Sequence, residues 1–341
     1  MGVRLKDVAE HAGVSIKTVS NVVRGEAHVS DATRERVLRS IAELGYRPHA
    51  SARHLRTGRS GILALAVPDL AAPYFAELAA AVIAAAKDLS STVLIEETGG
   101  DPEEELRIAC GLGSSLIDGV LLSPLRLDQE ALASRPRRMP LVLLGERDYG
   151  LPVDHVLIDN VAAAREVTAH LLSLGHTRVA AIGAQHGPAS ATAHQRVRGY
   201  QEALYRAGVP YDPALMCEVS AYRLADGVRA MRSLLELPEP PEAVFCFNDL
   251  LAAGALRAAA DHGLSVPRDV AVAGFDDIEL SQYSVPSLTT VAPDKAELAR
   301  LAVTALLRRI EDTEQAPPAV LYAGHRLVVR ESSGARGTAR P

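Results

Sequence analysis

Two short helical patterns joined by the three-residue turn Gly13–Ser15 open this chain, and they restrict its first domain more than any other feature. In the first pattern apolar residues recur at helical spacing and form one side of the helix: Leu5, Val8, Ala9 and Ala12. Gly13 follows at the position where a left-handed residue commonly ends a helix. Two helices joined by so short a turn predict a helix-turn-helix over residues 5–23.

The second helix of this motif is predicted to begin after Ser15, whose hydroxyl can accept from the free amides of the first turn. Its apolar side is formed by Val19, Val22 and Val23. Three other residues then lie near the helix start or on its opposite side: Ile16, Lys17 and Asn21. In a helix-turn-helix these positions are free to meet base edges in a DNA major groove.

A third helix is predicted over residues 31–44, between the capping Ser30 and the terminating Gly45. The segment 46–60 that follows is basic, and a proline stands at the start of a short helical stretch over residues 48–55. A helix this short is unstable alone in water, so the stretch suits a segment that folds only against DNA. A plain flexible linker is the alternative interpretation.

Charge is distributed unevenly along the chain. Residues 1–60 hold 11 Lys and Arg against 6 Asp and Glu, whereas residues 61–341 hold 25 against 36. A basic head on an acidic body is typical of a DNA-binding module attached to a regulatory domain. No apolar run reaches the roughly 20 residues that span a bilayer, and no signal-peptide core is present, so we expect a cytoplasmic protein. The three cysteines lack metal-ligand spacing and are expected to be reduced core thiols.

From Gly61 onward, apolar strand-like runs alternate with helical patterns. The expected strands are residues 62–67, 92–95, 119–122, 141–144, 179–182, 243–247 and 270–273. The expected helices lie near residues 74–89, 102–113, 160–174, 193–207, 223–236 and 249–262. Near-continuous apolar strands separated by helices predict parallel α/β sheets. Roughly 270 residues exceed one doubly wound sheet, so we expect two lobes with a ligand between them at the carboxyl ends of the strands.

The head of the chain resembles that of the lac-repressor (LacI/GalR) family of bacterial transcription regulators. The matching positions there are residues 5–15, 18–23, 29–30, 33–37, 44–48 and 52–56. Further matches follow in the same order along the body: Asp118–Val120, Asp159–Asn160, Leu174–His176, Arg196 with Gly199–Tyr200, Phe247–Asp249, Gly274–Asp277, Pro286–Val291 and Arg330–Ser332. Because these matches are many and co-linear, the resemblance is highly specific.

The resemblance implies an N-terminal all-α helix-turn-helix domain and an α/β effector domain with two doubly wound lobes of the periplasmic-binding-protein type I fold. The implied organisation is a helix-turn-helix over 1–45, a hinge helix and linker over 46–60, an N-terminal lobe over 61–159 with 291–318, a C-terminal lobe over 160–290 with 319–332, and a disordered tail over 333–341. It also implies a homodimer that reads a pseudo-palindromic operator in double-stranded DNA under the control of a small effector, with no cofactor and no metal.

Carried over position by position, the base-reading residues of the family fall at Ile16, Lys17 and Asn21. Lys17 can donate to guanine, Asn21 can pair with adenine or hold a phosphate, and Ile16 offers only apolar contact. The implied phosphate contacts are Ser15, Thr18, Ser30 and Arg34. Leu55 matches the hinge leucine that wedges into the minor groove. Arg4 stands where the family commonly has Thr, so the first helix lacks its usual cap.

The effector-binding residues implied by the resemblance are Tyr74, Phe75, Asp159, Arg196, Tyr222, Asn248 and Asp276. Arg196 has a planar fork that suits the hydroxyls or carboxylate of an effector. The carboxylate of Asp276 can accept from two hydroxyls of one sugar. A sugar is therefore the favoured effector, and a purine or nucleoside is the alternative because aromatic rings at the site would also stack on a base.

Several alternatives stay open for individual residues and for the whole chain. Phe75 and Tyr222 can belong to the core, Asp159 can lie at the rim of the site, and Asn248 or Asp249 can simply cap a helix. A solute-binding module without DNA function is the alternative from another functional class, and the basic head argues against it. No catalytic set of residues stands out, so we do not expect an enzyme.

Overall fold

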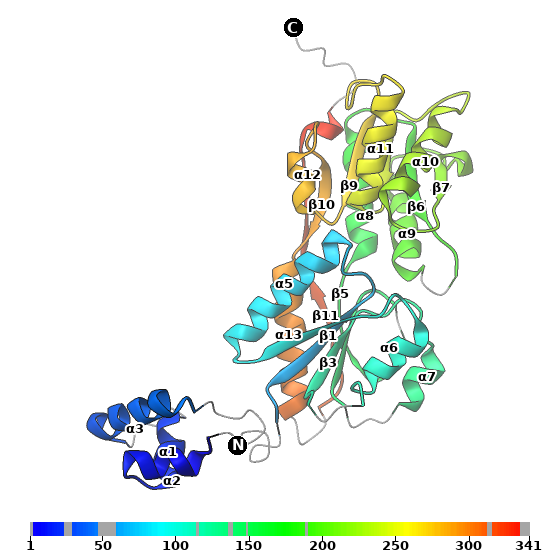
Figure 1. Cartoon of the computed structure of the whole chain (residues 1–341). Coiled ribbons are helices and arrows are strands. Elements are labelled where there is room, and N and C mark those ends of the chain that lie inside the picture. The colour runs from blue at the N-terminus through cyan, green and yellow to red at the C-terminus, as the bar shows by residue number, and fades with distance from the viewer. Residues whose placement is uncertain are drawn as a thin grey trace. The chain divides into compact units, whose positions relative to one another are not determined.

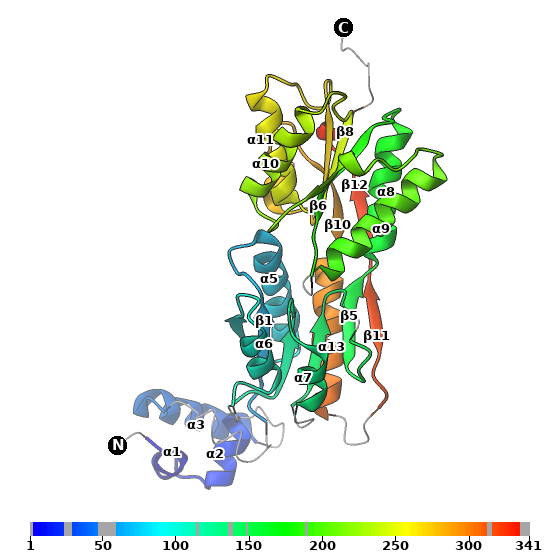
Figure 2. The same ribbon diagram turned by 90° about the vertical axis from the view of Figure 1, so that its right-hand side faces the viewer.

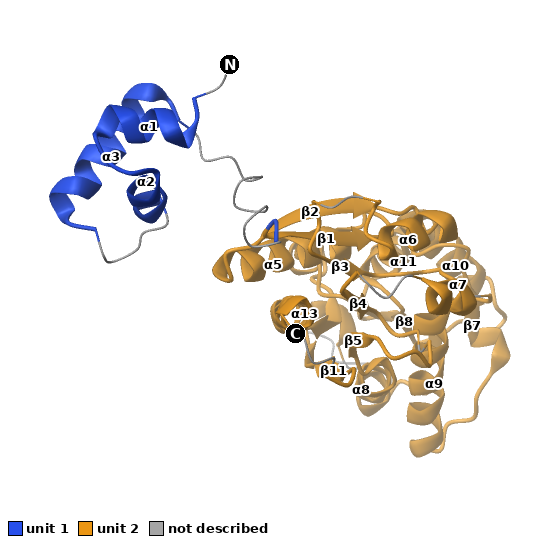
Figure 3. Ribbon diagram, turned by 90° about the horizontal axis from the view of Figure 1, so that it is seen from below, with its two compact units in different colours: residues 1–60 blue, residues 61–341 orange. Residues whose placement is uncertain are grey.

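The computed structural model (Figure 1) describes residues 3–23, 29–46, 59–113, 116–135, 139–147, 149–187, 190–311 and 316–334. The chain divides into two compact units, residues 1–60 and residues 61–341 (Figure 3). The predicted hinge helix, including Leu55, lies outside the described residues. Within the described ranges, the structure contains no helix that is long and apolar enough to cross a membrane.

The first unit contains the three predicted helices, α1 (Leu5–Ala12), α2 (Ile16–Val23) and α3 (Asp31–Leu44). They enclose a small apolar core made of Val8, Ala9, Ala12, Val19, Val22, Val37 and Tyr46. Gly13 and Gly45 end α1 and α3 with positive φ angles of +63° and +62°. Both glycines therefore adopt the left-handed conformation that their positions predict.

Side-chain caps fix the starts of the two helices of the motif. The Ser15 hydroxyl accepts from the backbone amide of Thr18 at 3.1 Å, so the predicted cap of α2 is confirmed. At the start of α1, the Asp7 carboxylate accepts from the backbone amide of Arg4 at 2.7 Å. Asp7, the third residue of α1, thus satisfies a free backbone amide at the helix start. It compensates in part for the capping threonine that the family commonly has in place of Arg4.

The first lobe of the second unit is a six-stranded sheet in the order β11-β5-β4-β3-β1-β2, and every pair is parallel. Its strands are β1 (Ile62–Val67), β2 (Thr92–Glu97), β3 (Gly119–Leu122), β4 (Leu141–Leu144), β5 (Asp154–Ile158) and β11 (Val320–Ala323). Helices α5 (Pro73–Asp88) and α13 (Lys295–Glu311) cover one face, and α6 (Pro102–Ala109) and α7 (Gln129–Ser134) cover the other (Figure 1).

The second lobe is a six-stranded sheet in the order β12-β10-β9-β8-β6-β7, in which only β12 runs antiparallel to its neighbour. Its strands are β6 (Val179–Ala184), β7 (Met216–Glu218), β8 (Ala243–Cys246), β9 (Ala271–Phe275), β10 (Thr289–Pro293) and β12 (His325–Val328). Its helices are α8 (Asn160–Ser173), α9 (Ala191–Arg206), α10 (Leu224–Leu235), α11 (Asp249–Asp261) and the short α12 (Glu279–Tyr283). In Figure 2, α8 and α9 lie on one side of this sheet and α10 and α11 on the other. The two doubly wound lobes confirm the predicted fold class.

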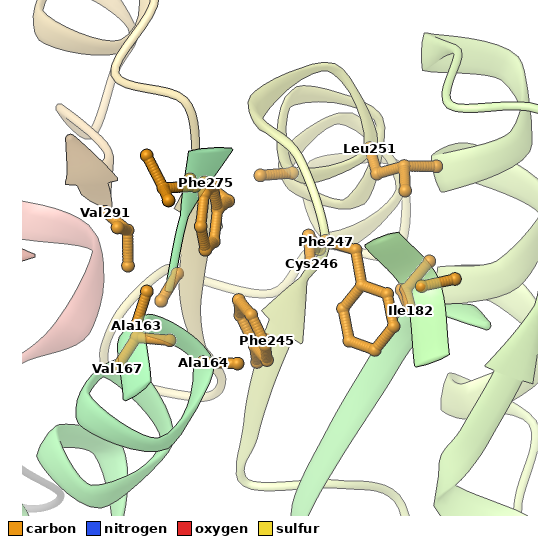
Figure 4. Packing of buried hydrophobic residues seen from close by; sticks show 14 of the residues in the cluster. Ala163, Ala164, Val167, Ile182, Phe245, Cys246, Phe247, Leu251, Phe275 and Val291 are labelled. Carbon is orange, nitrogen blue, oxygen red and sulfur yellow. The ribbon is translucent and has the colours of Figure 1, made fainter. Parts of the chain in front are cut away.

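Aromatic rings fill the core of the second lobe between small side chains (Figure 4). The rings of Phe245 and Phe247 lie with their centroids 5.2 Å apart. Ala164 and Val167 of α8 approach the rings from one side, and Leu251 of α11 lies on the other (Figure 4). Buried strands of this kind have helices on both faces, so their sequences read as continuous apolar runs.

Three crossings join the lobes in the described part of the chain. The first lies at Asp159, between β5 and α8, where the sequence places it. The second lies at Asp294 because all of β10 pairs within the second sheet, and the third lies at Gly324 because β11 pairs with β5 of the first sheet. The predicted boundaries at 290/291 and 318/319 therefore fall a few residues early, since a strand stays with the sheet to which it is hydrogen-bonded.

The predicted disordered tail begins too early, because Ser333 is only 2% exposed. Its hydroxyl lies 2.7 Å from the hydroxyl of Thr289 and 2.9 Å from Nε2 of His170. The hydroxyl of Ser332 donates to the carbonyl of Val272 at 2.6 Å. These serines form hydrogen bonds with buried polar groups next to β9 and β10, so the segment that contains them packs against the second lobe. Residues 335–341 lie outside the described residues.

Gly199 allows α8 and α9 to approach closely, and it offers a direct test of this packing. A Cβ atom at Gly199 would lie 2.3 Å from the backbone oxygen of Val161. We predict that Gly199→Ala lowers the free energy of unfolding by about 1–3 kcal/mol, although alanine favours helix over glycine. Urea unfolding measures this change, with Gln201→Ala, an exposed position of the same helix, as the control. A stability equal to that of the wild type would contradict the close approach.

Candidate functional site

The facing ends of the two lobes are joined by hydrogen bonds. Glu146 follows β4 in the first lobe, and its carboxylate accepts from the Thr192 hydroxyl of α9 at 2.6 Å. Its backbone oxygen accepts from the Gln195 side-chain amide at 3.1 Å. In addition, the Glu77 carboxylate of α5 accepts from the backbone amide of Glu279 at 2.9 Å. The carboxyl ends of both sheets therefore meet at one place, where doubly wound folds bind ligands.

Arg196 of α9 is the charged group at the centre of this place, and it is only 5% exposed. Its Nε donates to Oδ1 of Asn160 at 2.7 Å, and its Nη1 donates to the backbone oxygen of Phe247. The guanidinium lies over the ring of Phe275, 3.5 Å from the ring centroid. Because a buried cation needs partners, these contacts hold the fork in one orientation.

Asp276 follows β9 and is 8% exposed. Its Oδ1 lies 3.9 Å from Nη2 of Arg196, which is a longer approach than the bond between Arg196 and Asn160. Burial raises the pKa of the Asp276 carboxyl to about 8, although the charge of Arg196 opposes the increase. At neutral pH this carboxyl therefore carries a proton most of the time and can donate a hydrogen bond as well as accept one.

Two tyrosines lie beside Arg196 and Asp276. Burial raises the pKa of the Tyr74 phenol well above its usual value, and Glu146 and Asp276 raise it further. Burial also raises the pKa of the Tyr222 phenol. Arg196 opposes this increase, whereas Asp276 and Glu146 add to it. The five side chains that interact in this way are called the interlobe cluster: Tyr74, Glu146, Arg196, Tyr222 and Asp276. They supply rings, hydroxyls, carboxyls and a guanidinium at one site.

Other predicted site residues lie beside the interlobe cluster or away from it. The Tyr222 hydroxyl donates to the backbone oxygen of Gly183 at 2.9 Å, which fixes the position of its ring. Phe75 is half-buried and packs edge-on against Tyr74, with ring centroids 5.2 Å apart. Asp159 is exposed, and its carboxylate caps α8 by accepting from the amide of Ala162 at 2.8 Å.

Asn248 and Asp249 separate into two different roles. The Asn248 side chain caps α11 by accepting from the amide of Leu251 at 2.9 Å, and it also donates to the backbone oxygen of Tyr222 at 3.4 Å. Asp249 is 1% exposed and accepts from the hydroxyls of Ser281 and Thr290 at 2.7 and 2.6 Å. Asp249 is therefore a buried structural carboxyl, and burial raises its pKa to about 6.

Sequence reasoning missed two residues of this place, Glu146 and Asn160. Glu146 lies two residues after the predicted strand 141–144, so its position near the carboxyl end of a parallel strand was a usable signal. Asn160 was recognised only as part of a family motif with Asp159. Its contact with Arg196 joins residues far apart in sequence, and a single sequence holds no signal for such a pair.

The first unit presents the predicted DNA-contacting residues on α2 and at the start of α3. Ile16 is 50% exposed although it is apolar, and Lys17 is exposed beside it. Ser15 and Ser30 are also exposed, whereas Thr18, Asn21 and Arg34 are half-buried. The Ser15 and Thr18 hydroxyls lie 2.9 Å apart. An exposed apolar residue at the start of a helix-turn-helix recognition helix is suited to contact with DNA.

A helix-turn-helix unit followed by a two-lobed α/β unit defines a DNA-binding regulator with a ligand-binding domain. The family model described as "Bacterial regulatory proteins, lacI family" matches residues 4–49, and the model described as "Periplasmic binding protein-like domain" matches residues 168–333.

Three known proteins show how far this similarity extends. The HTH-type transcriptional repressor CytR of Escherichia coli (strain K12) is 36% identical over 309 residues, covering 90% of this chain and 89% of CytR. The solved complex of the regulator CelR with cellobiose is 34% identical, with a TM-score of 0.71, and the match covers 97% of this chain and 99% of CelR. The lac repressor dimer bound to operator and the anti-inducer ONPF is 28% identical, with a TM-score of 0.83 and coverage of 98% and 100%.

The chain belongs to the lacI family of bacterial regulatory proteins. It is a DNA-binding transcriptional regulator with a periplasmic-binding-protein-like effector domain. Its relatives are regulators and not enzymes, so the expectation that the chain is not an enzyme is confirmed.

The raised pKa of Asp276 predicts a specific dependence of stability on pH. The folded protein keeps the proton up to about pH 8, whereas the unfolded chain releases it near its usual value of 3.8. The favourable contribution is therefore complete below the unfolded value and is lost as the pH rises through the folded value. Asp276→Asn removes this titration, so its free energy of unfolding relative to the wild type should increase between pH 5 and pH 9.

Urea unfolding at pH 5, 7 and 9 measures this difference. Asp69→Asn, a half-buried carboxyl outside the interlobe cluster, is the control and should not reproduce the trend. The same difference between Asp276→Asn and the wild type at all three pH values would contradict a buried, protonated Asp276.

Proposed function

We propose that this chain is a homodimeric transcriptional repressor whose operator binding is controlled by a sugar held at the interlobe cluster. The observation that carries this proposal is the arrangement of Arg196, Asp276 and Glu146 with two tyrosine rings between the lobes. The Arg196 guanidinium can donate charge-assisted hydrogen bonds to sugar hydroxyls, and a protonated carboxyl at Asp276 can both donate to them and accept from them. Aromatic faces pack against the apolar faces of sugar rings.

The relatives support a sugar as the effector. CelR was solved with cellobiose, and the ribose operon repressor of Haemophilus influenzae is 35% identical to this chain over 315 residues. A nucleoside is the second candidate, because the rings of Tyr74 and Tyr222 can stack on a base as well as on a sugar. Phe75, Asp159 and Asn248 are proposed to border the bound ligand, as the family resemblance implies.

A dimer is supported by exposed apolar residues on both lobes. Ile83 of α5 is 44% exposed, and Leu94 on the edge strand β2 is 41% exposed. On the second lobe, Leu280 and Tyr283 of α12 are 51% and 68% exposed. Large exposed apolar residues of this kind favour burial against another chain, and we propose that a second copy covers them. The lac repressor, which this chain resembles over almost its whole length, was solved as a dimer.

On the DNA side we propose that α2 enters the major groove of each half-site of a pseudo-palindrome. Ile16, Lys17 and Asn21 would read base edges, and Leu55 would wedge into the minor groove. The phosphate contacts would be Ser15, Thr18, Ser30 and Arg34. Two copies related by a two-fold axis would then read two half-sites in opposite directions.

A thermal-shift screen tests the effector proposal on the purified full-length chain. Cellobiose, ribose, adenosine and adenine are the probes, since a ligand that binds only the native state raises the melting temperature. A rise with cellobiose or ribose supports a sugar effector. A rise with adenosine or adenine alone would replace the sugar by a base-containing ligand.

Arg196→Lys tests whether the interlobe cluster is the effector site. The substitution keeps the positive charge but removes the planar fork, so it should abolish the thermal shift and the effect of the ligand on operator binding. Operator affinity without ligand should stay near that of the wild type in an anisotropy titration. Arg206→Lys, at the far end of α9, is the control. A normal response of Arg196→Lys to the ligand would place the site elsewhere.

Lys17→Ala tests the recognition helix. Loss of a base contact should change which operator variants are preferred and should cost about 1–3 kcal/mol at one position of each half-site. The control is Arg39→Ala, which removes an equal charge from an exposed position of α3. Binding across a library of operator variants measures the preference. Equal specificity profiles for Lys17→Ala and the wild type would defeat the assignment of α2 as the recognition helix.

A further inference from the structure

Asn160 is a completely buried polar side chain at the first position of α8, with an exposed fraction of 0%. Its Oδ1 accepts from Nε of Arg196 at 2.7 Å, and its Nδ2 lies 3.5 Å from the backbone oxygen of Ile158. The start of α8 does not need this amide as a cap, because the carboxylate of the neighbouring Asp159 already caps the helix. The buried amide therefore has a role toward Arg196.

The contact with Asn160 helps to determine which guanidinium nitrogen faces Asp276. The face of the Phe275 ring attracts the cation but favours no particular N–H donor, so this contact alone does not select the nitrogen. The hydrogen bonds from Nε to Asn160 and from Nη1 to Phe247 engage the other two nitrogens. Nη2 is then the nitrogen that faces Asp276, at 3.9 Å.

The spacing between Asn160 and Arg196 is fixed by the packing of α8 against α9. At Gly199, one turn beyond Arg196, the backbone approaches Val161 so closely that a Cβ atom would lie 2.3 Å from its oxygen. Tyr200 is buried next to it and donates to the backbone oxygen of Val179 at 2.7 Å. Because α9 cannot slide along α8 without breaking these contacts, the Asn160 oxygen stays within reach of Nε.

We propose that Asn160 is a positioning residue that sets the guanidinium of Arg196 for effector binding. Its role rests on the proposed function, in which Arg196 contacts the effector. Asn160 directly follows the interlobe crossing at Asp159, so the orientation of the fork is tied to the segment that joins the lobes. A neutral amide suits this role, because it accepts from Nε without adding a second carboxylate to compete with a ligand for Arg196.

An NMR measurement on the ligand-free full chain tests the positioning directly. Arginine labelled with ¹⁵N gives a resonance for each Nε–H, and the resonance that disappears in Arg196→Lys belongs to Arg196. In the wild type we expect this proton to exchange slowly with water, because it is buried and hydrogen-bonded to Asn160. In Asn160→Leu, which has the same branched side-chain skeleton but no acceptor, the exchange should be at least about tenfold faster.

Two further variants separate positioning from general destabilisation. Asn160→Asp keeps an acceptor oxygen at the same place, so it should retain slow exchange. Thr168→Val removes a different buried hydroxyl of α8, which donates to Ala164 at 2.8 Å, and it should also leave the Arg196 resonance unchanged. Equally slow exchange in Asn160→Leu and the wild type would overturn the proposal. If Asn160→Leu does not fold, loss of slow exchange in a folded Asn160→Ser or Asn160→Ala decides the same question.

Binding of the probe panel separates this inference from the proposed function. With cellobiose, ribose, adenosine and adenine as probes, Asn160→Leu should weaken the affinity of the bound probe about tenfold or more, and Asn160→Asp should weaken it less. If Arg196→Lys binds the probes as the wild type does, the proposed effector site is wrong. If Arg196→Lys loses binding while Asn160→Leu keeps full affinity, the effector site stands and the positioning role of Asn160 is wrong.

Discussion

The burial of one guanidinium between the lobes governs the arrangement around it. Arg196 is 5% exposed, and a cation that has lost its water must find partners within the protein. Its partners come from the start of α8, the end of β8 and the end of β9: Asn160, Phe247, Phe275 and Asp276. Burial also raises the pKa of the Asp276 carboxyl to about 8, although the nearby Arg196 guanidinium lowers it. A ligand with several hydroxyls can bind these groups because they already point toward one site.

Much of the fold could be predicted from the sequence where the local pattern and the final environment agree. The strand Ile62–Val67 and the helix Leu5–Ala12 match their predictions, because one is buried on both faces and the other is apolar on one side. The strand Asp154–Ile158 has a polar start and gives no such pattern. Asp154 is nevertheless 1% exposed, because Arg309 from α13 pairs with it at 3.0 Å. That pairing becomes evident only once distant segments are packed together. The helix α13 itself was not predicted, although its buried apolar residues recur at helical spacing.

In the candidate site, too, some residues could be predicted from the sequence, whereas contacts between distant segments could not. Family resemblance alone gave Arg196 and Asp276, and the structure brings them together with Tyr74 and Tyr222. The role of Asn160 could not be inferred in this way, because it comes from a partner on a neighbouring helix. Glu146 was missed although it lies close to the carboxyl end of a predicted strand, and its partner on the other lobe was not evident from the sequence. Two of the three predicted lobe boundaries lie a few residues before the observed crossings for a related reason. Only the hydrogen bonding of β10 and β11 shows to which sheet each strand belongs.

The central claim is that occupancy of the interlobe cluster and operator binding are coupled. Reciprocal titration tests it most directly: the affinity for a labelled operator is measured with and without saturating sugar from the probe panel, and the affinity for the sugar is measured with and without operator. If the two sites are coupled, both affinities change by the same factor, because the coupling free energy is shared. A sugar that binds tightly but leaves operator affinity unchanged would contradict the account.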